Sequence, residues 1–359
     1  MVSLESSTKE TWKIRKLVLL TIFMWLASSQ IFVALSFDLL YGTDSKAYLL
    51  ASQNLDSFPP LELPLYPAMV ALFRELLPVI SPKIYMQGIS LVAYVLAVVG
   101  VYLILEHYRS TLALFGALLF AMFPLEGVTL SVFPRVNSLM YLSVVGALLL
   151  YVKGYARASI AVMSLSLLTH KSVWPIVLVV GVVGVYDRRL KWWSLPLIFL
   201  PLIAYWVAGA FYHDDPAWLF NRSISVKFQN HSDINIPVFA GLIGTFKSGF
   251  DGDIADLIKA VIVTISFVLA AFLLFSMMWT TQKWLLGIIL PNLLWPAVLN
   301  QGELWSSISY THLIVLPLVF WLERSGLAWS RSRTVWLVIL GACAASQIVW
   351  TVYIVRYFS

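Results

Sequence analysis

Long apolar runs, separated by short polar segments, constrain the fold of this chain more than any other feature of its sequence. The clearest runs cover residues 84–105, 193–212 and 254–278. A helix that crosses the roughly 30 Å hydrocarbon core of a bilayer needs about 20 apolar residues, because each residue adds about 1.5 Å. Lipid offers no hydrogen-bond partners, so a crossing segment must pair its backbone groups within itself. The runs therefore predict an all-α polytopic membrane protein.

The composition agrees with this fold class and excludes several others. Charged residues make up 12% of the chain and hydrophobic residues 60%, whereas a soluble domain is about 25% charged. Many aromatic residues stand near the ends of apolar runs, as in the aromatic belts of membrane proteins. The single cysteine, Cys343, excludes a disulfide within the chain and a cysteine metal cluster. No basic run is typical of a nucleic-acid surface, so we expect no nucleic-acid partner.

Basic residues give the chain an orientation in the membrane. Lys13, Arg15 and Lys16 precede the first apolar run, and the short loop 187–191 is the clearest basic connection. Because basic residues favour the cytoplasmic side, we predict a cytoplasmic N-terminus and an outer C-terminus. A cleaved signal peptide is the alternative interpretation of the first run. About eleven predicted spans cover 17–36, 84–105, 111–123, 132–151, 158–169, 173–186, 193–212, 254–278, 284–299, 305–322 and 334–355.

The whole chain, 1–359, is predicted to form one transmembrane domain without a separate soluble domain. Its two long polar segments, 38–83 and 213–253, are the predicted outer loops. Within the first outer loop, residues 45–54 and 65–77 have the pattern of short amphipathic helices that lie along the membrane surface. The first outer loop is therefore the part of the chain where polar chemistry and membrane meet.

Asp44 is the candidate catalytic residue of this loop. If residues 45–54 are helical, Asp44, Tyr48 and Ser52 lie on one face because they are four residues apart. A carboxylate at the membrane surface, beside a cavity, can accept a proton from a hydroxyl nucleophile. Asp44 or Thr43 also suits a helix cap that satisfies free N–H groups at the start of the helix. The two roles are compatible, because a capping carboxylate stays ionised and able to accept a proton.

Three short motifs carry a resemblance to a known family. They are Asp44-x-x-x-Tyr48-x-x-Ala51, Leu65-Tyr66-Pro67-Ala68 and Tyr310-x-His312-x-x-x-x-Pro317. In their order and spacing the chain resembles the GT-C membrane glycosyltransferases, which include the dolichyl-phosphate-mannose-dependent mannosyltransferases and the bacterial aminoarabinose transferases. It departs from that family in two places. Many members have a paired carboxylate where this chain has Asp44-Ser45, and Ser309 stands where Arg is common.

The resemblance implies a GT-C-like fold with two juxtamembrane helices in the first outer loop. It also implies an inverting transfer of a sugar at the non-cytoplasmic face, with Asp44 as the base and Tyr48 beside it. The donor would be a polyprenyl- or dolichyl-phosphate-linked sugar, with its tail in a groove below the outer loops among membrane lipids. The acceptor would be a hydroxyl group of a glycan, lipid or protein. The departing phosphate needs cations or hydrogen-bond donors, for which the candidates are Arg135, Lys171, Arg222, Lys227, His231, Tyr310 and His312.

Functions from other classes also fit parts of this pattern. A flippase or transporter for a lipid-linked sugar predicts more charge within the apolar runs than this chain contains. A non-catalytic GT-C-like subunit agrees with the single carboxylate at Asp44 and with Ser309. A ligase or polymerase of the O-antigen type is a further alternative, but its large outer loop normally falls late in the chain.

The segment His213-Asp214-Asp215-Pro216 is the one that suggests a metal site. The same residues match a helix start better, with Asp215 as the cap and Pro216 as the first helical residue. We therefore expect neither a metal centre nor another cofactor. Participation of a divalent metal in the transfer is left open.

Overall fold

The computed structural model describes residues 43–53, 63–123, 136–170, 173–216, 239–277, 282–298, 312–327 and 332–358, with Trp25, Leu55 and Trp218. Within these residues every regular element is a helix and there is no strand. The predicted all-α fold class is therefore confirmed for the described part of the chain.

The helices follow the predicted apolar runs closely. Helix α9 covers Val173–Tyr186, as predicted, and α4 covers Pro82–His107. Helix α10 covers Ser194–His213. The others are α5 Ala113–Ala121, α7 Asn137–Val152, α8 Ala156–Ser166, α12 Ala240–Phe250, α13 Ile254–Met277, α14 Leu286–Val298 after the 3₁₀ turn η3 Lys283–Leu285, α16 Val315–Ser325 after the 3₁₀ turn η5 His312–Ile314, and α17 Arg333–Phe358. The predicted span 17–36 lies outside the described residues, apart from Trp25.

Among the described residues, three helices are long and apolar enough to cross a membrane. They are Pro82–His107, Ser194–His213 and Asp256–Met277. Shorter apolar helices cover Asn137–Val152, Val173–Tyr186, Lys283–Leu294 and Thr334–Val349. The structure is thus compatible with an integral membrane protein, while the number of spans stays a prediction.

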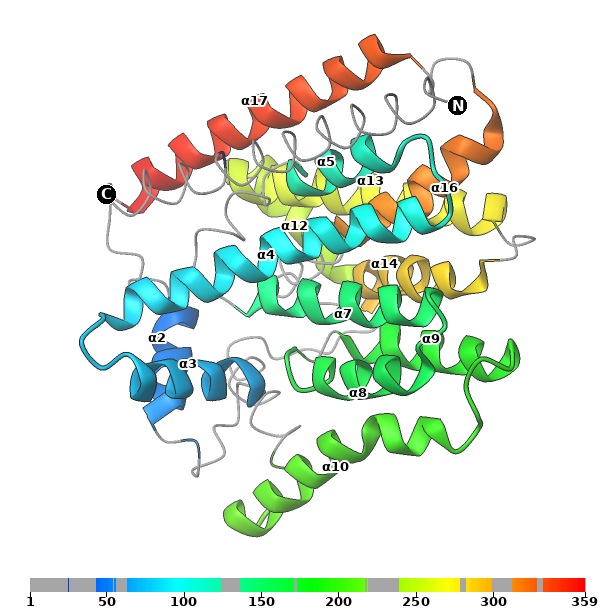
Figure 1. Cartoon of the computed structure of the whole chain (residues 1–359). Helices are drawn as coiled ribbons and strands as arrows, with labels where there is room; N and C mark the ends of the chain where they lie inside the picture. Colours follow the sequence, from blue (N-terminus) through cyan, green and yellow to red (C-terminus); the bar gives the residue numbers. More distant parts are fainter. Residues whose placement is uncertain are drawn as a thin grey trace, which may run out of the picture.

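The long helices stack in layers. Helix α4 packs on α7, α7 on α8, and α8 on α10, and Figure 1 shows these four helices one below the other. On the other side of α4 lie α5, α13 and α16, and α17 crosses over α5 (Figure 1). Helix α14 lies between α13 and α9. The apolar core runs through all these layers, from the buried side of α4 to that of α16.

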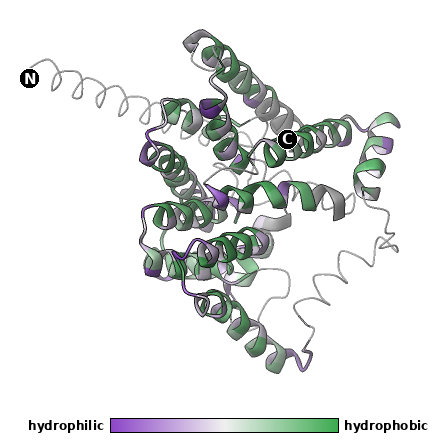
Figure 2. Ribbon diagram, turned by 90° about the vertical axis from the view of Figure 1, so that its right-hand side faces the viewer, coloured by the Kyte–Doolittle hydropathy of each residue, from purple (hydrophilic) through white to green (hydrophobic). Residues whose placement is uncertain are grey.

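Apolar side chains also point outward from the bundle. Figure 2 shows hydrophobic residues along most of the helices, with hydrophilic residues mainly at helix ends and connections. On α13, Ile265 is 61% exposed and Val268 is 59% exposed. Soluble proteins rarely expose contiguous apolar surface of this kind, whereas helices surrounded by lipid do.

The segments that the sequence assigns to the cytoplasmic side gather at one end of the bundle. Trp284 Nε1 donates a hydrogen bond to the Tyr108 hydroxyl over 3.2 Å, and Tyr108 packs edge-to-face on Phe320. The Thr111 hydroxyl donates to Glu323 Oε1 over 3.0 Å, which ties the start of α5 to the end of α16. This clustering is compatible with connections that lie alternately on the two sides of a membrane. Which end of the bundle faces the cytoplasm is a prediction from the distribution of charge.

We expect Gly249→Ala to destabilise the α12–α13 hairpin strongly. A Cβ atom at Gly249 would lie 2.6 Å from Leu257 Cβ and 2.7 Å from the Leu257 backbone nitrogen. Backbone atoms cannot rotate away, so the two helices must separate, at a cost of about 1–3 kcal/mol or more. Gly341→Ala is the control, because a Cβ there meets nothing within 4 Å. Thermal unfolding in detergent measures both, and equal midpoints would contradict the close packing.

Candidate functional site

The two short helices predicted for residues 45–54 and 65–77 are present and pack on each other. Helix α2 covers Thr43–Gln53 and α3 covers Leu65–Leu76. Between them the rings of Tyr48 and Tyr66 meet edge-to-face with centroids 5.0 Å apart. Tyr48 and Ser52 are both buried, so the predicted shared face of α2 is its inward face. The two motifs of the first outer loop therefore contact each other in the folded chain.

Tyr66 attaches this pair of helices to α4. Its side chain is fully buried, and its hydroxyl donates to the Met86 carbonyl over 3.4 Å and also bonds with Ser90. Burial raises the pKa of the Tyr66 hydroxyl well above its usual value, while the Ser90 hydrogen bond lowers it less. The hydroxyl thus stays protonated and acts as a donor. Tyr66 therefore acts as a positioning residue. It belongs to the motif Leu65-Tyr66-Pro67-Ala68, but the sequence alone did not identify its contacts with Met86 and Ser90.

A second attachment joins α3 to the turn after α8. The Leu65 backbone N–H donates to the Leu168 carbonyl over 3.1 Å. This bond satisfies one of the free N–H groups that every helix start presents. It also brings the start of α3 beside the turn that contains Thr169 and His170, directly before Lys171. The structure therefore joins two segments that lie about a hundred residues apart in the sequence.

Most of the predicted site residues lie outside the described part of the structure, either wholly or in their side chains. Asp44 belongs to the first turn of α2, one helical turn before Tyr48, but its side chain lies outside the described part of the structure. Asp44 is therefore placed by its backbone only. The following candidates also lie outside the described residues: Arg135, Lys171, Arg222, Lys227, His231 and Tyr310. Their contacts with a donor phosphate stay predictions.

His312 is buried inside the bundle at the start of η5. Its ring is 0% exposed and lies among aromatic side chains, with the Phe123 ring centroid 4.4 Å away. Its Nδ1 lies 3.2 Å from the Tyr141 hydroxyl, and its Nε2 has no hydrogen-bond partner in the described structure. Phosphate contact at His312 requires a path through this aromatic packing, and it too stays a prediction.

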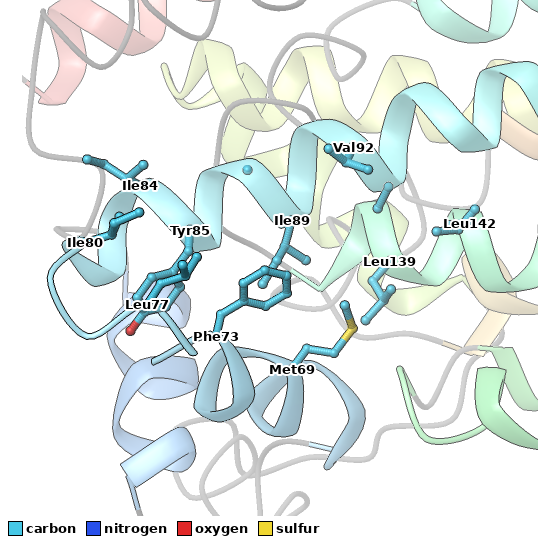
Figure 3. A pocket seen from close by; sticks show the side chains of 12 residues that line it. Met69, Phe73, Leu77, Ile80, Ile84, Tyr85, Ile89, Val92, Leu139 and Leu142 are labelled. Carbon is cyan, nitrogen blue, oxygen red and sulfur yellow. The ribbon is translucent and has the colours of Figure 1, made fainter. Parts of the chain in front are cut away.

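An apolar groove lies directly beside α3. It has a volume of about 350 Å³ and is formed by α3, α4 and α7. Figure 3 shows Met69 and Phe73 of α3, with Leu77 directly after that helix, facing Tyr85 and Ile89 of α4. Leu139 and Leu142 of α7 lie toward its other end. The groove was not located by the sequence, although Met69, Phe73 and Leu77 are spaced by four residues, which is the usual sign of one helix face.

The helix start predicted at Asp215 and Pro216 lies at the edge of the described residues, and Trp218 just beyond it is helical. His213 is the last residue of α10, and Asp214 follows it in a left-handed conformation with φ 51°. Asp215 then accepts a backbone hydrogen bond from Trp218 over 3.1 Å. Among the described residues, no group of three or more His, Cys, Asp or Glu side chains is arranged to hold a metal ion.

No protein-family model, curated protein or solved structure matches this chain.

Proposed function

We propose that this protein is a GT-C-type membrane glycosyltransferase that takes a sugar from a polyprenyl-phosphate donor. The observation that carries the proposal is the contact between the two motifs of the first outer loop. The Tyr48–Tyr66 ring pair holds α2 on α3, and Tyr66 in turn holds α3 on α4. A helix that begins with an acid and is fixed in this way on the bundle suits a base at the membrane surface.

In the proposed reaction Asp44 takes the proton from the acceptor hydroxyl. The acceptor oxygen then forms a bond to the anomeric carbon while the bond from that carbon to the donor phosphate breaks. A direct displacement of this kind inverts the anomeric centre, and the lipid phosphate leaves with its negative charge. That charge needs stabilisation by cations or hydrogen-bond donors.

A first candidate for the phosphate cation is Lys171. In the sequence it follows the turn whose Leu168 carbonyl accepts the Leu65 N–H, and this turn is described as far as His170. Arg135 directly precedes Val136, which packs with Tyr48 and Tyr66 in one cluster. These two are our first candidates for phosphate contact, ahead of Arg222, Lys227 and His231.

The proposed topology places this site on the non-cytoplasmic side. About eleven spans, with a cytoplasmic N-terminus, carry the α2–α3 pair to the outer face. Labelling of single introduced cysteines in a Cys343→Ala background tests this orientation. A cysteine at exposed Gln53 should react with an impermeant reagent added outside cells, and one at exposed Arg188 should not.

The activity itself is tested with the purified protein and radiolabelled polyprenyl-phosphate sugars. An enzyme releases lipid phosphate and transfers the label in detergent, where no compartments exist. A flippase moves the lipid across vesicle membranes without releasing lipid phosphate. A non-catalytic subunit does neither unless its partner is added. Absence of release with the common hexose and pentose donors, together with transport in vesicles, would falsify the enzyme proposal.

A further inference from the structure

The groove beside α3 has the lining and the size that suit a hydrocarbon chain. Its described walls are apolar except for one hydroxyl, that of Tyr85. Its volume of about 350 Å³ equals that of about a dozen water-sized groups, at about 30 Å³ each. Water in such a groove lacks the two to four polar partners that it requires. A flexible apolar chain fills the groove without that loss.

The rim of the groove continues into apolar surface that faces away from the bundle. Ile84 is 61% exposed and Val92 is 54% exposed, and both line the groove on α4. Leu77 and Ile80, in the connection from α3 to α4, are also exposed. In a membrane protein a groove with such a rim opens toward the bilayer, so its occupant comes from the lipid phase.

Two basic residues adjoin lining residues of the groove. Arg74 lies in the last turn of α3, directly after the lining residue Phe73. Lys83 lies in the first turn of α4, two residues before Tyr85. The Tyr85 hydroxyl is buried and has no hydrogen-bond partner in the described structure. Glu75 pairs with Arg74 over 3.5 Å, but it is 76% exposed, and exposed pairs contribute little.

We propose that the groove binds one acyl chain of an anionic bilayer phospholipid, with the phosphate near Arg74 and Lys83 and a headgroup oxygen accepting from Tyr85. The bound lipid would hold α3 against α4 and α7. Because α2 packs on α3, the lipid would also hold α2 on the bundle. The inference does not depend on glycosyl transfer, because it concerns the attachment of these helices to the bundle.

The donor lipid fits this groove less well than a bulk phospholipid. None of the described lining residues lies on α2, whereas the sugar of a donor must reach Asp44 at the start of α2. Arg74 and Lys83 can attract any lipid phosphate, and the groove lining offers no polar group beyond Tyr85 that would recognise a sugar. Among the anionic lipids that fit, the one present at the highest concentration fills the site most, and in a bilayer that lipid is a phospholipid.

Gly88→Leu provides the test, because it fills the groove. Gly88 lines the groove, and a Cβ atom there meets nothing within 4 Å, so a larger side chain enters empty space. Delipidated protein is titrated with phosphatidylglycerol, and thermal unfolding reports binding. We expect the half-saturating lipid concentration to rise at least about tenfold in Gly88→Leu. Native mass spectrometry should show one retained phospholipid in the wild type and its loss in the variant.

Matched variants separate the groove from general effects. Gly341→Leu gains the same helix propensity at an exposed position of α17 with nothing within 4 Å, so it should bind like the wild type. If Gly88→Leu does not fold, Gly88→Met replaces it with a more flexible side chain. Tyr85→Phe and Arg74→Gln should keep the response to phosphatidylcholine but lose the preference for phosphatidylglycerol.

Three results would overturn the proposal. The first is an unchanged lipid response in Gly88→Leu or Gly88→Met. The second is the absence of stabilisation by either phospholipid in the wild type. The third is displacement of phosphatidylglycerol by an equal or lower concentration of undecaprenyl phosphate, which would make the groove a donor site. Each of these leaves the glycosyl-transfer assay unaffected, so the two proposals fail independently.

Discussion

Transfer by the Asp44→Asn variant is expected to fall by about 10²- to 10⁴-fold, the usual contribution of a general base. The amide has nearly the shape of the carboxylate but cannot accept the acceptor proton. Its side-chain oxygen can still accept a hydrogen bond from a free N–H group at the start of α2, as the carboxylate can. Helix α2 should therefore form as before. The rate of lipid phosphate release, measured with the purified variant at saturating donor, checks this expectation.

Asp251→Asn is the matched control for this variant. Asp251 is an exposed acid at the end of α12, and the change removes the same charge from the chain. We expect its transfer rate and its unfolding midpoint to equal those of the wild type. A fully active Asp44→Asn variant would remove Asp44 from the mechanism. If the variant were inactive but also poorly folded, capping at the start of α2 would be its main role.

The helices could be predicted from the sequence because a chain segment in lipid must satisfy its backbone hydrogen bonds within itself, which favours apolar helices. Apolar runs between basic and aromatic residues gave the bounds of α9 correctly and those of α4 and α10 to within about two residues. The short amphipathic stretches of the first outer loop were also located correctly as α2 and α3. The number of membrane crossings does not follow from these bounds, because within the described part of the chain helix length and composition identify three clear candidates.

The contacts between these helices could not be predicted. The hydrogen bond from Leu65 to Leu168, like the one from Thr111 to Glu323, joins residues that are far apart in the sequence and follow no local pattern. The groove depends on the shapes of three helices together, so no single segment contains a sign of it. Tyr85 was read as a residue of an apolar run, and only the fold shows that its hydroxyl lacks a partner.

Tyr66→Ala is expected to release the α2–α3 pair from the bundle. Tyr66 is fully buried and contacts α2 through Tyr48 and α4 through Met86. Removal of a buried aromatic ring costs about 3–5 kcal/mol. Because α2 then loses its support, we expect transfer to fall at least about tenfold, which corresponds to 1.4 kcal/mol of lost positioning. Thermal unfolding and limited proteolysis between α2 and α3 measure the structural part.

Two further variants test whether the loss of stability and activity in Tyr66→Ala comes from its buried ring. Tyr66→Phe keeps the contact with Tyr48 and loses only the hydrogen bonds, so it should cost about 1 kcal/mol and retain most of the activity. Tyr155→Ala removes a ring that is 61% exposed near the opposite end of the bundle, and it should change neither quantity. If Tyr66→Ala protected the α2–α3 connection from proteolysis as well as the wild type does, α2 would be held by other contacts. The contact between the two motifs would then no longer support a fixed base at Asp44, and the glycosyltransferase proposal would lose the observation on which it depends.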